Sequence, residues 1–517
     1  MAGFKGLLGV LVTAAARPRR GSAEHYALAD ADRDQEESAG LLSARFPTPT
    51  SPHAHARAYT PRRRLPHALL RLCTLRRALA ACAAACVLLV AGILWSGVPP
   101  AFDDIREFER RLPQHDLALP SPEGREGMYL RFPDHLWGHG LNNVLQEIIL
   151  LSHLAFLTNR SFVFEDYTWS HTPLPYTLYD FALRPARIPL NAFISGPSAG
   201  GPMPAPRAVA LEHWNTVCPP ENITVVSSRG APSDIDGEAL MQWWVDALAP
   251  VRARCVEVES REQPVFDRFL FGSKNILSLW PALAASPALA NYTWSPLVHA
   301  ALARNFALLQ PLSAAALINS ASGSSSRARA QAPLPGLLAV HIRRGDYERH
   351  CARLAAWGSL YMGFNEFPGL PDTFDPRPYL SPNASRASAD APPQGETRLE
   401  YYMRHCLPSA AQVAARLRAV RAAHPAGDLR RVFVLTNAGW AWRRALERAL
   451  RADGWADVRA GADLVLDAEQ RYVAMAVDMA VAERAAVFVG NGFSSLTSNI
   501  VMLRLARGME VESNRFL

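Results

Sequence analysis

Apolar and polar positions from residue 126 onward follow the pattern of a chain that repeats strand, loop and helix. The run "GMYLRFP" predicts a strand at 127–133, and the apolar helical run "VLQEIILLSHLAFLTN" follows after a glycine-containing loop. A second predicted strand, "SFVFEDY", comes directly after that helix. Strand, helix and strand in this order form one unit of a parallel sheet, so the pattern predicts an α/β fold.

The alternation resumes after residue 335 in a second half of similar size. Helical patterns at 398–424, 440–454, 470–483 and 494–508 separate or follow the predicted strands "GLLAVHI", "RRVFVLTN", "ADLVL" and "AAVFVGN". Loops are expected at 196–210 and 312–335, and a surface insertion at Phe367–Glu396. We therefore expect two α/β domains, 126–320 and 321–517, with ligands bound in a cleft at the C-terminal ends of the strands.

The N-terminal part of the chain has a different character. Residues 1–77 are rich in Arg, Pro, Ala and Ser, which predicts a disordered cytosolic tail. Residues 78–98 carry no charge, are long enough to span a bilayer and follow an arginine-rich stretch. The positive-inside rule then predicts a single-pass type II membrane protein of the endoplasmic reticulum or Golgi, with a stem at 99–125 and a lumenal catalytic region. A buried helix is the alternative interpretation of 78–98.

Cysteines and glycosylation sequons agree with a lumenal location. Four cysteines follow residue 98, and an oxidising compartment favours pairing them. Three pairings are possible, and closeness in sequence favours Cys218 with Cys255 and Cys351 with Cys406. Candidate glycosylation sites in the same region are Asn159, Asn222, Asn291 and Asn383.

The positive charge of the chain does not point to nucleic acid. The formal net charge is +7, but lysine occurs only at Lys5 and Lys274 and all other fixed cations are arginines. The sequence has no zinc-finger spacing, no RNA-recognition motif and no basic stripe interleaved with aromatic residues. We therefore expect no nucleic-acid partner. The sequence also contains no CxxC pair, so we expect no zinc site.

Two loops at predicted strand ends carry residues suited to binding. In "GHGLNN", Gly140 lets the backbone approach a ligand, Asn142 is expected to face the cleft and Asn143 to cap the next helix. In "HIRRGDY", Arg343 and Arg344 follow a buried strand, where two guanidiniums suit a diphosphate. A tight capped turn and a surface ion pair are the respective structural alternatives.

The third loop, "VFVGNGFSSLTSNI", crowds hydroxyl groups at the start of the last predicted helix. Free N–H groups at a helix N-terminus, together with hydroxyl groups, form an anion site. Capping of the helix N-terminus requires one hydroxyl side chain, whereas the loop carries four, from Ser494, Ser495, Thr497 and Ser498. The pattern therefore favours a second set of phosphate contacts.

The three loops resemble motifs of the GDP-fucose-dependent protein O-fucosyltransferases and follow one another in the same order. The resemblance covers roughly Met128–Arg504. The wider superfamily includes the α1,6-fucosyltransferases. The resemblance implies a GT-B architecture, in which two Rossmann-like domains face each other across a cleft and the second holds GDP-fucose. It also implies inverting transfer of fucose to a hydroxyl of a protein or glycan acceptor, with no cofactor and no obligatory metal.

The resemblance further implies roles for individual residues. Arg343 would neutralise the β-phosphate as GDP leaves, Ser494 and Ser495 would bind the pyrophosphate, and Asn142 would lie by the sugar or acceptor. The remaining residues expected around the GDP-sugar are Gly140, Asn143, His341, Arg344, Asp346, Asp478 and Thr497.

Two positions depart from the family pattern. His139 stands where one branch of the family has a glutamate, and an imidazole with a pKa near neutrality can act as the general base. A purely structural histidine is the alternative, with Glu147 as another candidate base. Leu496 stands where the family usually has a phenylalanine that contacts the nucleotide base.

Two other functions fit parts of the sequence. A metal-dependent GT-A transferase would need an Asp-x-Asp motif at a strand end, and Asp234-Ile-Asp236 has these letters without a preceding apolar strand. A membrane-anchored protein that binds nucleotide sugars or glycans without turnover would keep the same loops. A chelator separates the first alternative from the predicted enzyme, and a turnover assay separates the second.

Overall fold

The computed structural model describes most of the chain after residue 74, and all described residues lie in one compact unit, His55–Leu517. The described ranges are 75–96, 99–133, 140–179, 182–310, 333–345, 347–380, 395–424 and 428–517. The predicted connection 312–335 lies outside them as far as residue 332, and its last two residues already belong to strand β10 (Leu334–Ile342). Nearly all of the predicted tail 1–77 also lies outside them. The predicted α/β fold with parallel sheets is confirmed, because the structure contains two five-stranded parallel sheets.

The first sheet has the strand order β7-β2-β1-β9-β8, and all its pairings are parallel. Its strands are β1 (Tyr129–Arg131), β2 (Ser161–Phe164), β7 (Val209–Ala210), β8 (Ile223–Ser227) and β9 (Cys255–Glu259). Helix α4 (Leu141–Leu157) joins β1 to β2 and is buried along nearly its whole length, as its apolar sequence predicts. Further helices of this half include α5 (Leu211–Val217), α6 (Gly237–Leu248), α9 (Pro287–Ala290) and α10 (Pro296–Arg304).

The second sheet has the order β12-β11-β10-β13-β14, also with every pairing parallel. Its strands are β10 (Leu334–Ile342), β11 (Arg431–Thr436), β12 (Asp457–Ala460), β13 (Ala485–Gly490) and β14 (Asn514–Phe516). After β10 the chain adds β11 and β12 on one side of it, and then adds β13 and β14 on the other side. The boundary between β10 and β13 is therefore a topological switch point, where ligands of open α/β sheets bind.

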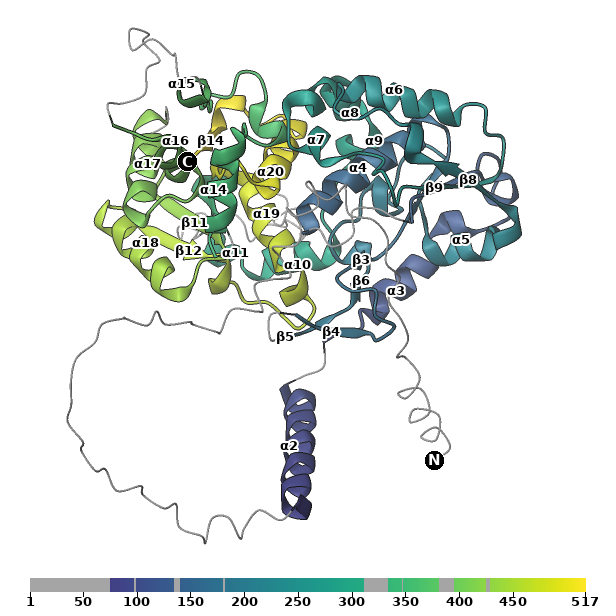
Figure 1. Cartoon of the computed structure of the whole chain (residues 1–517), viewed down its shortest axis with the longest axis horizontal. Coiled ribbons are helices and arrows are strands. Elements are labelled where there is room, and N and C mark those ends of the chain that lie inside the picture. Colours follow the sequence, from purple (N-terminus) through teal and green to yellow (C-terminus); the bar gives the residue numbers. More distant parts are fainter. Residues whose placement is uncertain are drawn as a thin grey trace, which may run out of the picture. The chain divides into compact units, whose positions relative to one another are not determined.

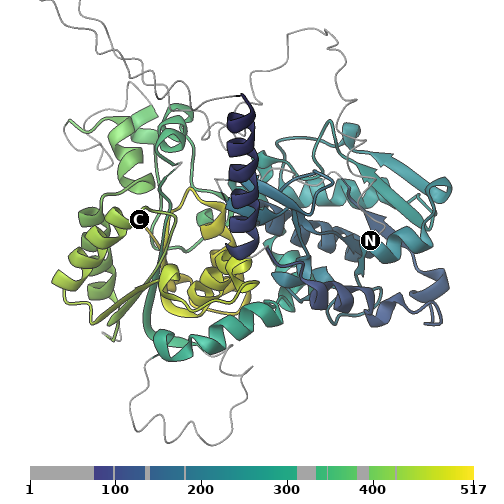
Figure 2. The same cartoon turned by 90° about the horizontal axis from the view of Figure 1, so that it is seen from below.

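Helices cover both faces of the second sheet, which explains its nearly uninterrupted apolar strands. Leu338, Val340 and Ile342 of β10 pack with α17 (Ala410–Ala423) and α18 (Trp440–Ala452). Leu337 and Ala339, which point the other way, pack in the core that contains α19 (Ala474–Arg484) and α20 (Ser495–Ala506). Figure 2 shows the light green and the yellow helices on opposite sides of these strands.

Helices of the second half also pack against helices of the first. In Figure 1, α19 and α20 (yellow) lie beside α10 and α4. The Trp294 indole donates to the Glu483 carboxylate of α19 over 2.5 Å, and both side chains are buried. The two sheets are thus joined through a common apolar core.

Several predicted elements differ from the structure. The helix expected at 398–424 is two helices, α16 (Arg398–Cys406) and α17, because Pro408 interrupts it and Ser409 caps the second. The strand expected at "ADLVL" begins earlier, as β12, and "ADLVL" itself follows the strand end. The expected loop at 196–210 ends in the edge strand β7.

Two stretches expected at the surface pack instead against the sheets. In the predicted stem, Phe102 and Leu112 are buried beside α3 (Asp103–Arg110) and belong to the core. In the predicted insertion, Phe374 is buried, and Asp372 accepts hydrogen bonds from the backbone N–H of Phe516 and the Arg515 guanidinium. Residues 381–394 of that stretch lie outside the described residues.

Residues 78–98 fall largely within helix α2 (Leu75–Ser96). Across the described ranges, no helix combines the length and the apolarity needed to span a bilayer, so the predicted anchor is unconfirmed. Both favoured disulfides are confirmed, Cys218–Cys255 and Cys351–Cys406. Asn159, Asn222 and Asn291 are exposed, as glycosylation would require, and Asn383 lies outside the described residues.

Candidate functional site

The site forms where β10 and β13 end side by side. Val340 of β10 pairs with Val489 of β13, so the loops that follow the two strands meet at one edge of the sheet. His341 Nδ1 lies 2.9 Å from Thr497 Oγ1, and the Tyr347 hydroxyl donates to the Phe493 carbonyl over 2.8 Å. The structure therefore brings together the second and third motifs of the sequence.

The two arginines of this edge are held differently. The Arg344 guanidinium donates to the Pro408 carbonyl over 2.8 Å and lies 4.8 Å from the ring centre of Trp442, so part of its donor capacity is used within the fold. The Arg343 guanidinium lies 5.4 Å from the ring centre of Tyr347, next to the late loop. Gly345, with a φ of +65°, makes the turn that follows, a conformation that favours glycine.

The hydroxyls of the late loop divide into two pairs. Thr497 and Ser498 are fully buried; the first contacts His341 and the second accepts the Phe364 N–H over 3.0 Å. Within the described part of the chain, the hydroxyls of Ser494 and Ser495 make no hydrogen bond, and Ser494 does not cap α20. The second pair is therefore available to an anion at the N-terminus of this 12-residue helix.

The first motif reaches the same region through α4 and α20. Asn499 of α20 donates to the backbone carbonyl of Asn142 over 2.7 Å, and the Asn142 amide lies 3.1 Å from the Met475 sulfur. The prediction that Asn143 caps this helix is wrong, because Gly140 is the N-cap residue of α4 and Asn143 already lies in its first turn. His139 and Asp346, both predicted site residues, lie outside the described residues.

Burial and charge set the protonation of His341. Burial, aided by the neighbouring Arg343, lowers the pKa of the imidazole to about 3. His341 is therefore neutral at physiological pH, and its place in the site is that of a hydrogen-bonding partner of Thr497. Glu147, the other candidate base, is buried on α4 with only 2% of its surface exposed.

A disulfide braces the two loops from outside. Cys351, on α14 (Tyr347–Trp357) just after the arginine loop, is bonded to Cys406 at the end of α16. The Cys406 carbonyl accepts the Asn491 side chain of the late loop over 2.7 Å, and Pro408 two residues later accepts Arg344. The segment that follows α16 thus holds both loops in place.

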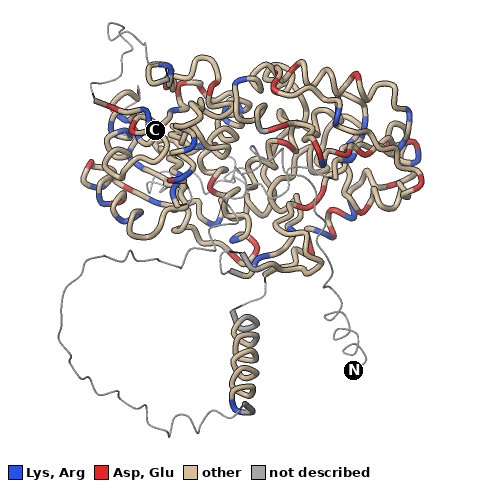
Figure 3. Tube along the Cα trace, viewed as in Figure 1, with Lys and Arg blue, Asp and Glu red and all other residues tan. Residues whose placement is uncertain are grey.

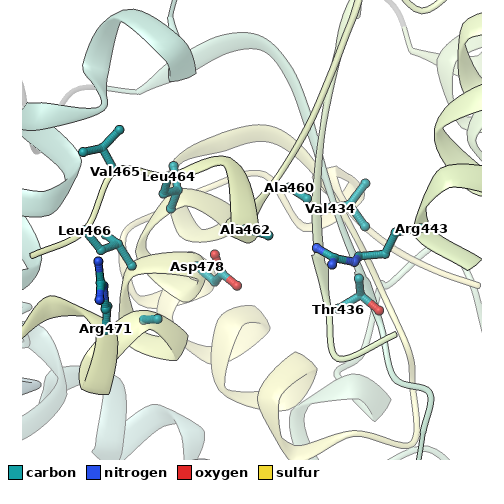
Figure 4. A pocket seen from close by; sticks show the side chains of 12 residues that line it. Val434, Thr436, Arg443, Ala460, Ala462, Leu464, Val465, Leu466, Arg471 and Asp478 are labelled. Atoms are coloured by element: carbon teal, nitrogen blue, oxygen red, sulfur yellow. The ribbon is translucent and has the colours of Figure 1, made fainter. Parts of the chain in front are cut away.

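A pocket of about 500 Å³ opens beyond the ends of β11 and β12, one strand away from Arg343. Its polar side chains are Thr436, Arg443, Arg471 and Asp478. In the view of Figure 4, Arg443 and Thr436 lie on one side, Arg471 on the other, and the Asp478 carboxylate between them. The predicted nucleotide residue Asp478 therefore faces a pocket beside the switch point.

The environment of Asp478 is unusual for a carboxylate. Burial raises the pKa of the Asp478 carboxyl to about 8. A Cβ atom at Gly461 would lie 2.4 Å from Asp478 Oδ1, so glycine at 461 allows the carboxyl group its position. A perturbed carboxyl group in a pocket marks a candidate functional residue.

The sequence pattern does not single out the arginines of this pocket. Arg443 lies in the first turn of α18, a helix with many basic positions, as Figure 3 shows for α17 and α18. Such a helix is typical of a solvated surface. The signal that would have singled it out is the polar strand end "TNAG" of β11, which precedes α18 as the other two loops precede their helices.

Asp236, of the Asp-x-Asp motif, has a structural role. Its side chain accepts the Glu238 N–H over 3.0 Å and caps α6, away from the strand ends of the second sheet. This capping contact accounts for an aspartate at position 236.

No family model matches the sequence, and the search of curated proteins finds no match. Among solved structures, the chain is similar to a crystal structure of POFUT1 in complex with GDP-fucose, with 14% identity, a TM-score of 0.41, and coverage of 76% of this chain and 98% of that one. It is also similar to NodZ alpha-1,6-fucosyltransferase soaked with GDP-fucose, with 13% identity, a TM-score of 0.33, and coverage of 73% and 92%.

Proposed function

We propose that the protein is a glycosyltransferase that transfers fucose from GDP-fucose to a hydroxyl group of a protein or glycan acceptor. The observation that supports it best is the convergence of three motifs at one end of the second sheet. Arg343, the Ser494–Ser495 pair and Asn142 are far apart in sequence, yet contacts between β10, α20 and α4 bring their loops together. Cationic and N–H donors at a switch point suit a diphosphate.

The proposed chemistry is a single displacement that inverts the configuration at the anomeric carbon of fucose. The acceptor oxygen forms the new bond to the anomeric carbon as the bond to the β-phosphate breaks, and GDP carries away the electron pair. Arg343 would neutralise the negative charge on the leaving phosphate, and the N-terminus of α20 would add donors. Fixed cations at this position supply the counter-charge that a divalent metal supplies in other transferases, so we propose a metal-independent reaction.

The acceptor proton requires a base near the first motif. We propose His139 for this role, with Glu147 of α4 as the alternative, because both belong to the segment that carries Asn142. We further propose that the protein acts in the lumen of the endoplasmic reticulum or Golgi as a type II membrane protein. The two disulfides and the three exposed sequons support an oxidising compartment.

Calorimetric titration of the purified full-length protein tests the donor. We expect GDP-fucose to bind in the presence of EDTA, and GDP-mannose and UDP-glucose to bind less tightly. Arg343→Ala should weaken GDP-fucose binding by on the order of tenfold to a hundredfold, since it removes a charge-assisted contact. Arg448→Ala, an exposed arginine on α18 that lines neither this edge nor the pocket, is the matched control and should bind as the wild type does.

Turnover separates an enzyme from a binding protein. We expect release of GDP from GDP-fucose once an acceptor is supplied from a panel of folded protein domains and glycans, and no loss of rate with EDTA. Failure of every GDP-sugar to bind would overturn the proposal. Tight binding without release of GDP across the panel would favour the nucleotide-sugar-binding protein instead.

A further inference from the structure

The pocket beside the switch point contains two arginines that the fold itself does not use. Arg443 and Arg471 both line it, and neither guanidinium forms an ion pair or hydrogen bond with any residue that the structure describes. The Arg443 Nε atom is buried and still has no hydrogen-bond partner among these residues. A buried donor without a partner is destabilising, which suggests that a ligand completes the site.

Neighbouring arginines on the same helix are paired within the protein. Arg451 forms an ion pair of 3.1 Å with Glu447, and Arg444 lies 3.9 Å from the same carboxylate. Arg443 points instead toward the pocket that Asp478 faces, as Figure 4 shows. Arg448, the remaining arginine of α18, donates its Nε–H to the Arg444 carbonyl. Arg443 is thus the arginine of this helix whose guanidinium has neither a hydrogen bond nor an ion pair among the described residues, and it lines the candidate nucleotide pocket.

The position of the pocket indicates which part of a nucleotide it would take. If the diphosphate lies at Arg343 and the start of α20, the rest of the nucleotide must extend along the strand ends. Strands are about 4.8 Å apart, so β12 lies roughly 10 Å from β10, which is comparable to the length of an extended nucleoside diphosphate. The pocket at β11 and β12 is therefore placed for the base.

Two kinds of hydrogen-bonding group face this pocket. In its ionised form the Asp478 carboxylate accepts hydrogen bonds, and the Arg443 guanidinium offers a planar fork of donors. Guanine has neighbouring N–H donors at N1 and N2 and neighbouring acceptors at O6 and N7. Adenine has an N–H donor where guanine has the O6 acceptor, and uracil has no N7, so neither base offers the same pair of edges.

We propose that Arg443 is a base-reading residue of the donor site, which donates to O6 and N7 of guanine while Asp478 accepts from the N1 and N2 edge. The assignment rests on the proposed function, since it assumes that GDP is part of the donor. It adds a residue that selects the nucleotide base to those that hold the phosphates. Arg471, on the opposite wall, remains available to the ribose or the solvent-facing side of the base.

The test compares GDP with 7-deaza-GDP, which lacks the N7 acceptor, by calorimetric titration of the full-length protein. Wild-type protein should bind GDP roughly tenfold to a hundredfold more tightly than UDP or ADP, and measurably more tightly than 7-deaza-GDP. In Arg443→Ala, GDP affinity should fall by a similar factor, and the preference for GDP over 7-deaza-GDP should disappear. Arg443→Lys keeps the charge but not the fork, and should lose the same preference.

Controls separate this inference from the proposed function. Arg448→Ala on the same helix should keep both the affinity for GDP and the preference over 7-deaza-GDP. Thermal unfolding should show that the Arg443 variants are folded. The ratio of the affinities for GDP and 7-deaza-GDP is measured on one protein sample, so it does not depend on the fraction of that sample that is active. Wild-type binding of GDP with an unchanged preference in Arg443→Ala would overturn the inference alone. A wild-type protein that binds no GDP would overturn both.

Discussion

The Cys351–Cys406 disulfide offers a sharp test of how the site is held together. We consider replacing both cysteines with alanine and, in a second variant, replacing Cys218 and Cys255 in the same way. The bridges close loops of 55 and 37 residues. The loop-entropy relation then gives losses of about 4.2 and about 3.8 kcal/mol in the free energy of unfolding. The two variants should therefore be destabilised almost equally.

Their effects on the site should differ. Removing the Cys351–Cys406 bridge frees the segment that holds Asn491 through the Cys406 carbonyl and Arg344 through the Pro408 carbonyl. Weakening two hydrogen bonds of about 0.5–1.5 kcal/mol each would lower nucleotide affinity by roughly tenfold. Cys218–Cys255 lies between α5 and β9 of the first sheet and should leave affinity unchanged.

The assay is urea denaturation for stability and calorimetric titration with GDP for affinity, both at 25 °C where each variant is folded. We expect matched losses of stability and an affinity loss in one variant only. An equal loss of affinity in both variants would refute the reasoning, since the bridges would then act only through overall stability. Unchanged affinity in both would show that the loops keep their positions without the brace.

Three further predictions concern protonation and buried contacts. Asn499→Ala should cost about 0.5–1.5 kcal/mol in urea denaturation, because it removes the buried hydrogen bond between α20 and the Asn142 carbonyl; a loss below the error of the measurement would contradict this. The pKa of Asp478 is about 8, so GDP affinity should rise between pH 7 and 9 as the carboxyl group ionises, and Asp478→Asn should abolish the rise. A fall over this range would show that the neutral acid binds. The folded pKa of His341 lies at about 3, below its ordinary 6.5, so the unfolded chain takes up the proton first and stability falls as pH drops from 6.5 to 3. In His341→Gln this acid-induced fall should be smaller, and an identical pH profile would contradict the assignment.

The parts of the fold that sequence predicted are those where one face or both faces of an element are apolar. Strands β10 and β13 are almost wholly buried, and their apolar runs end abruptly at the polar loops of the site. Strand β8 was missed because it is an edge strand whose side chains are largely exposed. Strand β12 was expected too late in the chain, at "ADLVL", because its own sequence "DVRA" is short and half polar. Edge strands take their conformation from pairing with a neighbour, which a local pattern does not record.

The residues of the candidate site also divide into those that the local sequence pattern predicts and those that it does not. Arg343 was predictable because two cations directly after a buried strand conflict with the local apolar pattern. Arg443 was not, since an arginine on an amphipathic helix is normal at a surface, and only the packing of α18 beside β11 and β12 turns it toward a pocket. Which hydroxyls of the late loop stay available was also beyond local sequence, because Thr497 and Ser498 are engaged by residues far away in the chain.

The packing of α20 against α4 has a mechanical consequence. Asn499 joins the two helices by a buried hydrogen bond to Asn142, and Trp294 joins the first half to α19 at Glu483. A hinge that swung one sheet away from the other would have to break both contacts inside a shared core. Exchange of a bound nucleotide is therefore expected to proceed through fast local fluctuations of loops and side chains at the rim, rather than through slow rotation of one half against the other.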